Sequence, residues 1–162
     1  MARKFSFFLF TFLLLSSLKV FAFTVMPTLF EDAVSRAHLI FKGTVIDRAI
    51  EDDAYESKKR VIYYKFQIEE CLKGICGTTY LFKQGKNVPG YEMGKTYLLF
   101  LSEENPRTGL SSPVGVSEGV YELTLKDEKW FMAQPSPKAK SGDEPTNDYG
   151  TFKERILYQL KK

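Results

Sequence analysis

The sequence predicts a mainly β protein, a sandwich or small barrel with one short N-terminal helix and one C-terminal helix. Two observations favour this class. Short apolar or alternating segments follow one another through the middle of the chain, and stretches containing Gly, Pro, Asn or charged residues separate them. Most of these segments have no helical pattern between them, and strands that follow one another without helices pack as sandwiches or close into barrels.

Residues 1–22 have the pattern of a signal peptide. Arg3 and Lys4 give a positive start, and residues 5–15 are almost wholly apolar. Val20 and Ala22 occupy the two positions where a signal peptidase requires small residues, so we predict cleavage after Ala22 and a secreted or periplasmic protein. The alternative is an uncleaved membrane anchor, but the apolar stretch is about half the roughly 20 residues that a spanning helix needs.

Removal of the signal peptide changes the charge balance of the chain. The full sequence has 23 basic and 20 acidic residues. Three of the basic residues and none of the acidic residues lie in the predicted signal peptide, residues 1–22. The mature chain therefore has no net charge. A basic field that would attract nucleic acid or anionic lipid is absent, so we predict neither a nucleic-acid partner nor a membrane-bound mature protein.

The predicted domain, residues 23–133, begins with a short helix and a first strand. Pro27 and Thr28 open the helix, and Thr28 with Glu31 fits a capping box. Residues 38–46, "HLIFKGTVI", form an apolar, β-branched strand. Gly43 in its middle has no side chain to pack, which indicates a bulge or a sharp bend.

The next strands follow a predicted polar loop at residues 48–60. Residues 61–70, "VIYYKFQIEE", alternate most clearly, which is typical of a half-buried antiparallel strand. One face of this strand carries only large apolar and aromatic side chains, and the opposite face carries Tyr63 and Lys65. The further strands are predicted at residues 78–83, 96–102 and 119–125, with a return at 129–133.

The C-terminal part of the chain has a different composition. Residues 134–150 contain three prolines and two glycines among polar residues, which predicts a flexible linker. Residues 151–162 then predict an amphipathic helix with Thr151 and Glu154 as a capping box. A helix this short is marginal alone, so we expect it to pack against the domain or against a partner.

The chain carries little that could catalyse a reaction, and we predict no catalytic residue, no metal site and no cofactor. His38 is the only histidine, and no nucleophile motif accompanies it. With two cysteines it falls short of a four-ligand zinc site. Glu69 and Glu70 are neighbours on a strand, so we expect their carboxylates on opposite faces, where they could not flank one bond.

Cys71 and Cys76 are expected to form a disulfide. In an exported protein two cysteines at this spacing form a bridge more readily than a redox site, because the compartment is oxidising. Gly74 supplies a turn between them. The small loop limits the entropic gain to roughly 2 kcal/mol. Two free buried thiols are the alternative.

Tyr63 and Lys65 are the candidate binding residues of the strand face. Basic and aromatic residues alternate in "SKKRVIYYKF", as they do in nucleic-acid-binding strands, but the absence of net positive charge speaks against that ligand. An oligosaccharide on an exposed strand face is the better expectation, because small β-barrels bind sugars there as well.

Three segments resemble a known family. In order and spacing, "AVSRAHLIFKGTVI", "YYKFQIEECLKG" and "MGKTYLLFLS" are similar to the netrin-like domain of the tissue inhibitors of metalloproteinases. The similarity is closer still to bacterial secreted proteins with that barrel, where "SSPVGVSEGVYEL" also has a counterpart. The resemblance covers residues 30–132 and implies a five-stranded OB-type Greek-key barrel.

The resemblance also implies a site. In that family a cysteine at the mature amino terminus chelates the zinc of the target protease, and disulfides hold that segment on the barrel. This chain has Phe23, Thr24 and Val25 at those positions, so the amine and carbonyl are present but the covalent tether is missing.

We therefore expect a non-enzymatic binding protein with an extracellular or periplasmic protease, or another protein, as its partner. The protease surface would combine the segment from Phe23 to Pro27 with the loop from Arg48 to Arg60. The alternative is an envelope module that binds a glycan or a structural protein through Tyr63 and Lys65.

Overall fold

The computed structural model describes residues 29–52, 60–85, 90–115, 118–134 and 146–162. The predicted signal peptide, Phe23, Thr24 and Val25 lie outside these ranges, as do residues 53–59 and most of the predicted linker. The described elements are α2 (Phe30–Arg36), β1 (Leu39–Asp52), β2 (Arg60–Lys73), β3 (Thr79–Gly85), β4 (Thr96–Leu101), β5 (Val120–Lys126), β6 (Lys129–Met132) and α3 (Tyr149–Gln159).

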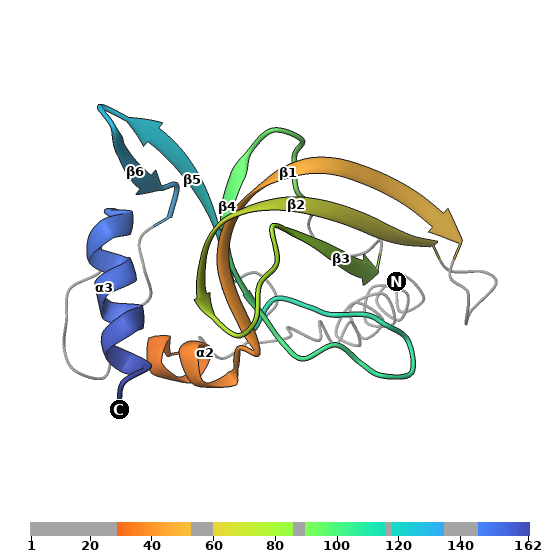
Figure 1. Cartoon of the computed structure of the whole chain (residues 1–162), viewed down its shortest axis with the longest axis horizontal. Helices are drawn as coiled ribbons and strands as arrows, with labels where there is room; N and C mark the ends of the chain where they lie inside the picture. The colour runs from red at the N-terminus through yellow and green to blue at the C-terminus, as the bar shows by residue number, and fades with distance from the viewer. Residues whose placement is uncertain (1–28, 53–59, 86–89, 116–117, 135–145) are drawn as a thin grey trace, which may run out of the picture.

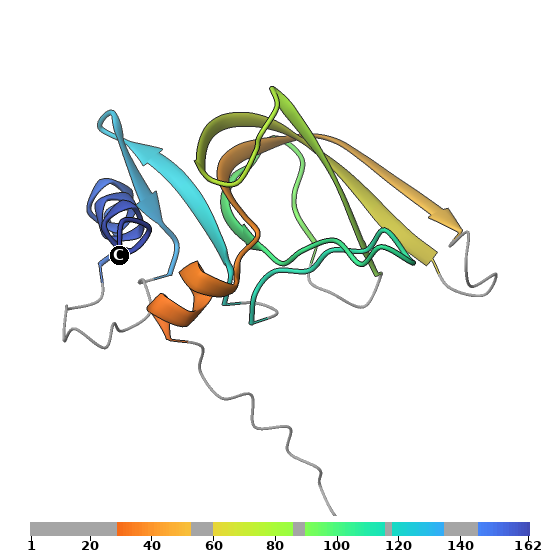
Figure 2. The same cartoon turned by 60° about the horizontal axis from the view of Figure 1, so that its bottom comes forward.

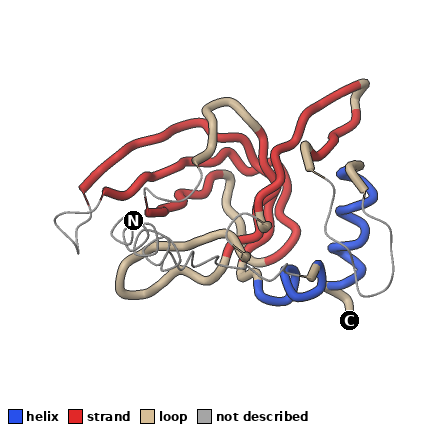
Figure 3. The backbone as a smooth tube through the Cα atoms, turned by 180° about the vertical axis from the view of Figure 1, so that it is seen from behind, coloured by secondary structure: helices blue, strands red, loops and turns tan. Residues whose placement is uncertain are grey.

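The strands form one antiparallel sheet of six strands in the order β3-β2-β1-β4-β5-β6. The sheet curves strongly, and β1 and β2 extend together toward one end of the molecule (Figure 1). Both helices lie at the other end, beside β5 and β6 (Figures 2 and 3). The mainly β prediction is confirmed.

Each face of the sheet supports its own apolar core, and β4 belongs to both. On the helix side, Leu98 and Phe100 pack with residues of α2, α3 and β5. On the opposite side, Leu99 and Leu101 pack with the inward residues of β1, β2 and β3. This double burial explains why β4 is apolar without alternation, and all six of its residues are buried. The alternating face predicted for residues 61–70 is confirmed, since Tyr64 and Phe66 are fully buried on it.

A closed five-stranded barrel, the expected form of the fold, is not observed. The described residues form six strands, and β3 and β5 do not pair to close the sheet. A loop occupies the free edge of β3 instead: the Ser111 N–H donates to the carbonyl oxygen of Lys83 at 3.1 Å, and the Lys83 ammonium donates to that of Thr108 at 2.9 Å. At the opposite edge of the sheet, β5 pairs with β6, and α3 packs beside this hairpin.

Three register shifts interrupt the pairing of β1 with β2; one lies between Ile40 and Phe41, and the other two shape the part of β1 that leads to the site. The pairing with β2 shifts register between Lys42 and Gly43, which confirms the predicted bulge. A Cβ atom on Gly43 would lie 2.8 Å from the backbone oxygen of Gln67, so only glycine fits without a shift of the backbone. The third shift lies between Val45 and Asp47. The strand continues to Asp52, so the predicted loop at residues 48–60 begins too early.

The helix starts also differ from the predictions. Helix α2 follows Leu29, which makes no side-chain cap, and Thr28 lies outside the described residues. Helix α3 begins at Tyr149, and its cap is Asp148 rather than Thr151. The Asp148 carboxylate accepts hydrogen bonds from the Thr151 N–H at 2.7 Å and from its hydroxyl at 2.8 Å. The predicted apolar stripe of α3 is confirmed, since Phe152 and Ile156 are fully buried.

Candidate functional site

The strand-face residues predicted to bind a ligand, Tyr63 and Lys65, lie together on the sheet. Both belong to β2, and their side chains point away from the buried face that carries Tyr64 and Phe66. We call this the outer face. Phe23, Thr24 and Val25 are outside the described residues, so their position relative to this face is not defined.

The pairing of the strands places residues of β1, β2 and β3 in rows across the outer face. Asp47, Lys65 and Leu81 form one row. Ala49, Tyr63 and Lys83 form the next. Neighbouring side chains in such rows contact one another across the strands, so the rows bring an aromatic ring, two amines and a carboxylate within reach of one ligand.

A shallow groove of about 270 Å³ runs over these rows. Leu81 is 62% exposed at its edge, and the Lys83 ammonium lies 5.8 Å from the centre of the Tyr63 ring. The β1 residues Asp47 and Glu51 bring carboxylates to the groove, and Arg48 of β1 and Lys65 of β2 bring positive charges. We call it the outer groove; it is lined by Asp47, Arg48, Ala49, Glu51, Tyr63, Lys65 and Leu81.

The described residues offer little for catalysis. His38 is exposed at the junction of α2 and β1, and its backbone N–H donates to the carbonyl oxygen of Leu101 at 2.8 Å. No group of three or more His, Cys, Asp or Glu side chains within the described ranges is arranged to hold a metal ion.

The predicted disulfide between Cys71 and Cys76 is present, with Cα atoms 5.9 Å apart. It joins the end of β2 to the turn before β3. Gly74 has φ +86°, a left-handed conformation that glycine adopts without strain, and a Cβ there would lie 2.8 Å from the carbonyl oxygen of His38. The bridge thus fixes a rim of the sheet at the end away from the outer groove.

A charged network around the buried Lys42, on the helix side of the sheet, was not predicted from the sequence. Lys42 of β1 is only 7% exposed, and its ammonium lies 2.9 Å from a carboxylate oxygen of Glu69 and 4.0 Å from the centre of the Trp130 ring. The Thr44 hydroxyl donates to the other Glu69 oxygen at 2.6 Å. The lysine is therefore paired and covered, as a buried charge must be.

Glu70, the neighbour of Glu69 on β2, holds the C-terminal helix α3. The Tyr149 hydroxyl donates to Glu70 at 2.6 Å, and Lys153 forms an ion pair with the same carboxylate. The expectation that Glu69 and Glu70 point to opposite faces is wrong. In the backbone register of β1 and β2, Lys42 lies opposite Glu70 and Gly43 lies opposite Ile68. Glu69 is therefore the extra residue of a bulge, and both carboxylates face the helix side.

Glu70 is expected to make the stability of the protein depend on pH. Burial would raise the pKa of this carboxyl, but the bonds from Lys153 and Tyr149 outweigh burial and hold the pKa below its ordinary value of 4.5. A carboxyl with a lowered pKa in the folded state adds stability above its unfolded pKa and loses it as the pH falls through the folded pKa. Urea unfolding at a series of pH values should therefore show a loss below about pH 4.5.

The matched variant for this measurement is Glu70→Gln, which can still accept the Tyr149 hydrogen bond but cannot titrate. Its free energy of unfolding should be lower than that of the wild type at pH 7, and the difference should shrink as the pH falls below 4.5. A difference that stays constant from neutral to acid pH would contradict this role of Glu70.

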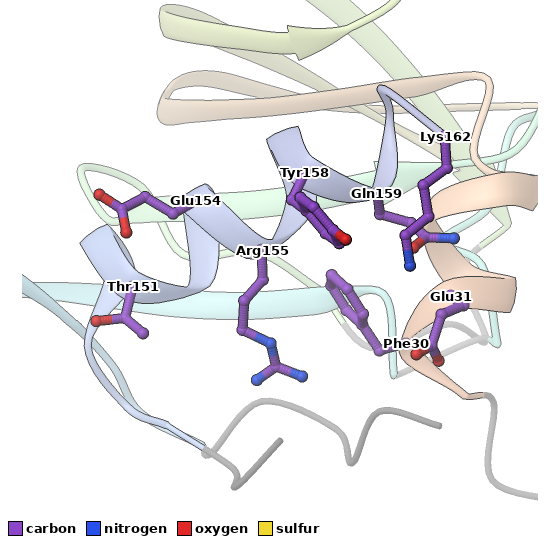
Figure 4. A pocket seen from close by; sticks show the side chains of 8 residues that line it. All are labelled: Phe30, Glu31, Thr151, Glu154, Arg155, Tyr158, Gln159 and Lys162. Atoms are coloured by element: carbon purple, nitrogen blue, oxygen red, sulfur yellow. The ribbon is translucent and has the colours of Figure 1, made fainter. Parts of the chain in front are cut away.

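A cleft of about 450 Å³ separates α2 from α3. Figure 4 shows Phe30 and Glu31 of α2 facing Arg155 and Tyr158 of α3 across it. The Arg155 guanidinium lies 4.9 Å from the centre of the Phe30 ring. This cleft is a second candidate site, but it adjoins the start of the described residues, so it defines no ligand class.

Neither helix that the structure describes is long and apolar enough to cross a membrane. No family model matches the chain, and no curated protein matches it. The resemblance to the netrin-like domain of the metalloproteinase inhibitors therefore stays a prediction.

Proposed function

We propose that this is an exported, non-enzymatic protein that binds a macromolecular partner through its outer groove. The observation that carries the proposal is the gathering of Tyr63, Lys65 and Leu81 on an open face beside the carboxylates of Asp47 and Glu51. A ring flanked by hydrogen-bonding groups of both charges suits the alternating polar and apolar faces of an oligosaccharide. The groove is slightly smaller than common small-molecule pockets, which fits a short stretch of a longer chain.

Export is part of the proposal. The Cys71–Cys76 disulfide is a bond that persists in oxidising compartments such as the periplasm or the extracellular space. Together with the N-terminal signal pattern it supports a secreted or periplasmic location.

A protease-directed role is the second candidate, and the strand order favours it. The order β3-β2-β1-β4-β5 is the one that a five-stranded OB barrel would show if it were opened between β3 and β5. We therefore infer an opened barrel of the OB type, in agreement with the resemblance to the netrin-like inhibitors. In that role the segment from Phe23 would act together with the tip of the β1–β2 ribbon.

Titration calorimetry with a panel of neutral oligosaccharides tests the proposal. Replacing both Tyr63 and Lys65 with alanine should weaken binding ~10-fold or more, because the stacking ring and one donor are lost. Lys126→Ala is the matched control, since Lys126 is exposed in the β5–β6 hairpin, far from the groove, and should bind as the wild type does.

Two results would contradict the outer groove as the binding site. The double variant could bind a panel member as tightly as the wild type, or the wild type could bind none of them. Inhibition of zinc metalloproteases that the double variant retains would instead favour the protease-directed role.

A further inference from the structure

The strand β1 extends well past its neighbour β4. Of its residues Leu39–Asp52, only those from Leu39 to Thr44 pair with β4. Residues 46–52 are all exposed, and among the residues that the structure describes they pair on one side only, with β2. Ile46 and Ile50 are 43% and 50% exposed there. A strand paired on one side presents a row of unpaired backbone groups to any strand that reaches it.

The alternation of the backbone shows which residues present these groups. The Val45 N–H donates to the carbonyl oxygen of Lys95 at 3.0 Å, and its own carbonyl accepts from Gly94 at 2.9 Å, so Val45 faces the β4 side. The bulge after Val45 inserts one residue and shifts the alternation. Beyond it, the even-numbered residues 48, 50 and 52 point their N–H and C=O groups away from β2.

A hydrogen bond agrees with this assignment. The Arg48 N–H donates to the carboxylate of the neighbouring Asp47 at 2.8 Å rather than to a strand. An exposed side chain supplies this acceptor, so the Arg48 N–H is open to exchange for a carbonyl oxygen of an incoming strand.

We propose that this edge pairs with the same edge of a second copy of the chain, in antiparallel orientation and with Ile50 opposite Ile50. In this register Arg48 lies opposite Asp52 of the second copy, and Asp52 opposite its Arg48. The outward backbone groups of these residues then form ladder hydrogen bonds, two exposed isoleucines bury each other, and two pairs of opposite charges face across the seam.

The charges select this register among the alternatives. Every register that opposes outward-pointing residues combines 48, 50 and 52 with themselves or one another. Pairing Arg48 with Arg48, or Asp52 with Asp52, opposes like charges. Pairing Arg48 with Ile50 places Asp47 opposite Glu51, and pairing Ile50 with Asp52 places Glu51 opposite Glu51. Among the pairs that the described residues 46–52 can form, only the register with Ile50 opposite itself has unlike charges across the seam.

The dimer would have a functional consequence that rests on the proposed function. A twofold axis perpendicular to the sheet joins two sheets into one and puts both outer grooves on the same face. One continuous partner chain could then contact both grooves, and binding would gain from avidity.

Sedimentation velocity over micromolar to near-millimolar concentrations tests the dimer. The full-length gene is expressed, and the protein is purified in the form that results from processing in the host cell. The wild type should show a concentration-dependent monomer–dimer equilibrium. Arg48→Asp and Asp52→Arg should each raise the dissociation constant about tenfold, because each places like charges across the seam twice. Combining R48D with D52R restores opposite charges and should return the constant to within about threefold of the wild type.

Both substituted side chains are exposed, and the intrachain pair of Asp52 with Arg60 is long, at 3.7 Å, so the variants should unfold at temperatures close to that of the wild type. A protein that stays monomeric at every concentration would overturn the proposal. So would a dimer that neither single variant weakens, or a combined variant that is as weak as the singles. The charge-swap comparison does not depend on any ligand of the outer groove, so this inference and the proposed function fail separately.

Discussion

Replacing Phe152 with alanine is expected to lower the free energy of unfolding by about 3–5 kcal/mol. The ring is fully buried, and its centre lies 5.4 Å from that of Phe30 and 5.3 Å from that of Tyr121. It therefore joins α2, α3 and β5 in one core. Truncation removes the aromatic contacts and leaves a cavity that the surrounding sheet and helices fill only in part.

Urea unfolding followed by far-UV circular dichroism measures this effect. Tyr158→Ala is the matched control, because Tyr158 lies on the same helix and is 66% exposed, and it should change the free energy of unfolding by less than about 0.5 kcal/mol. If Phe152→Ala costs no more than Tyr158→Ala, α3 does not pack on the sheet in solution, and the helix-side core is smaller than described.

The buried parts of the fold were predictable because burial leaves a pattern in the sequence. The alternation through Tyr64 and Phe66 and the apolar run of β4 marked two strands correctly, and Gly43 marked the bulge. The outer half of β1 was missed for the opposite reason. Residues 48–52, which were predicted as part of a loop, are exposed and leave no apolar pattern in the sequence. Backbone pairing with β2 holds this part of the strand.

Closure of the sheet was not predictable from local pattern. Whether β3 and β5 meet depends on what else reaches their edges, and here the loop around Ser111 bonds to β3. A mainly β class follows from segment patterns, whereas an open or closed sheet depends on contacts between residues far apart in the chain.

Part of the candidate site was predictable from the sequence, and the charged network around Lys42 was not. Tyr63 and Lys65 were predicted to share a face because strand alternation fixes it, and they do. The Lys42 network was missed because a bulge at Glu69 breaks that alternation. One sign was present in the sequence: a lysine in the middle of an apolar strand needs a partner, and the two glutamates of the next strand were the nearest candidates.

Replacing Lys42 with alanine is expected to lower the free energy of unfolding by about 2–3 kcal/mol. The change removes the ion pair with Glu69, the contact with the Trp130 ring and the buried alkyl stem. The loss is smaller than for a fully buried pair, because the Glu69 side chain is 32% exposed and keeps its hydrogen bond from Thr44. Water can therefore solvate the carboxylate that the lysine leaves.

Lys42→Met separates the alkyl stem from the charge. Methionine fills a similar volume against Trp130 without an ammonium, so we expect it to cost less than about 1.5 kcal/mol in the same urea experiment. If the methionine and alanine variants lose equal stability, the ion pair accounts for the whole effect and packing of the stem contributes nothing. A large difference between them would instead show that the sheet uses Lys42 chiefly as an apolar side chain, with Glu69 neutralising the charge that this position carries.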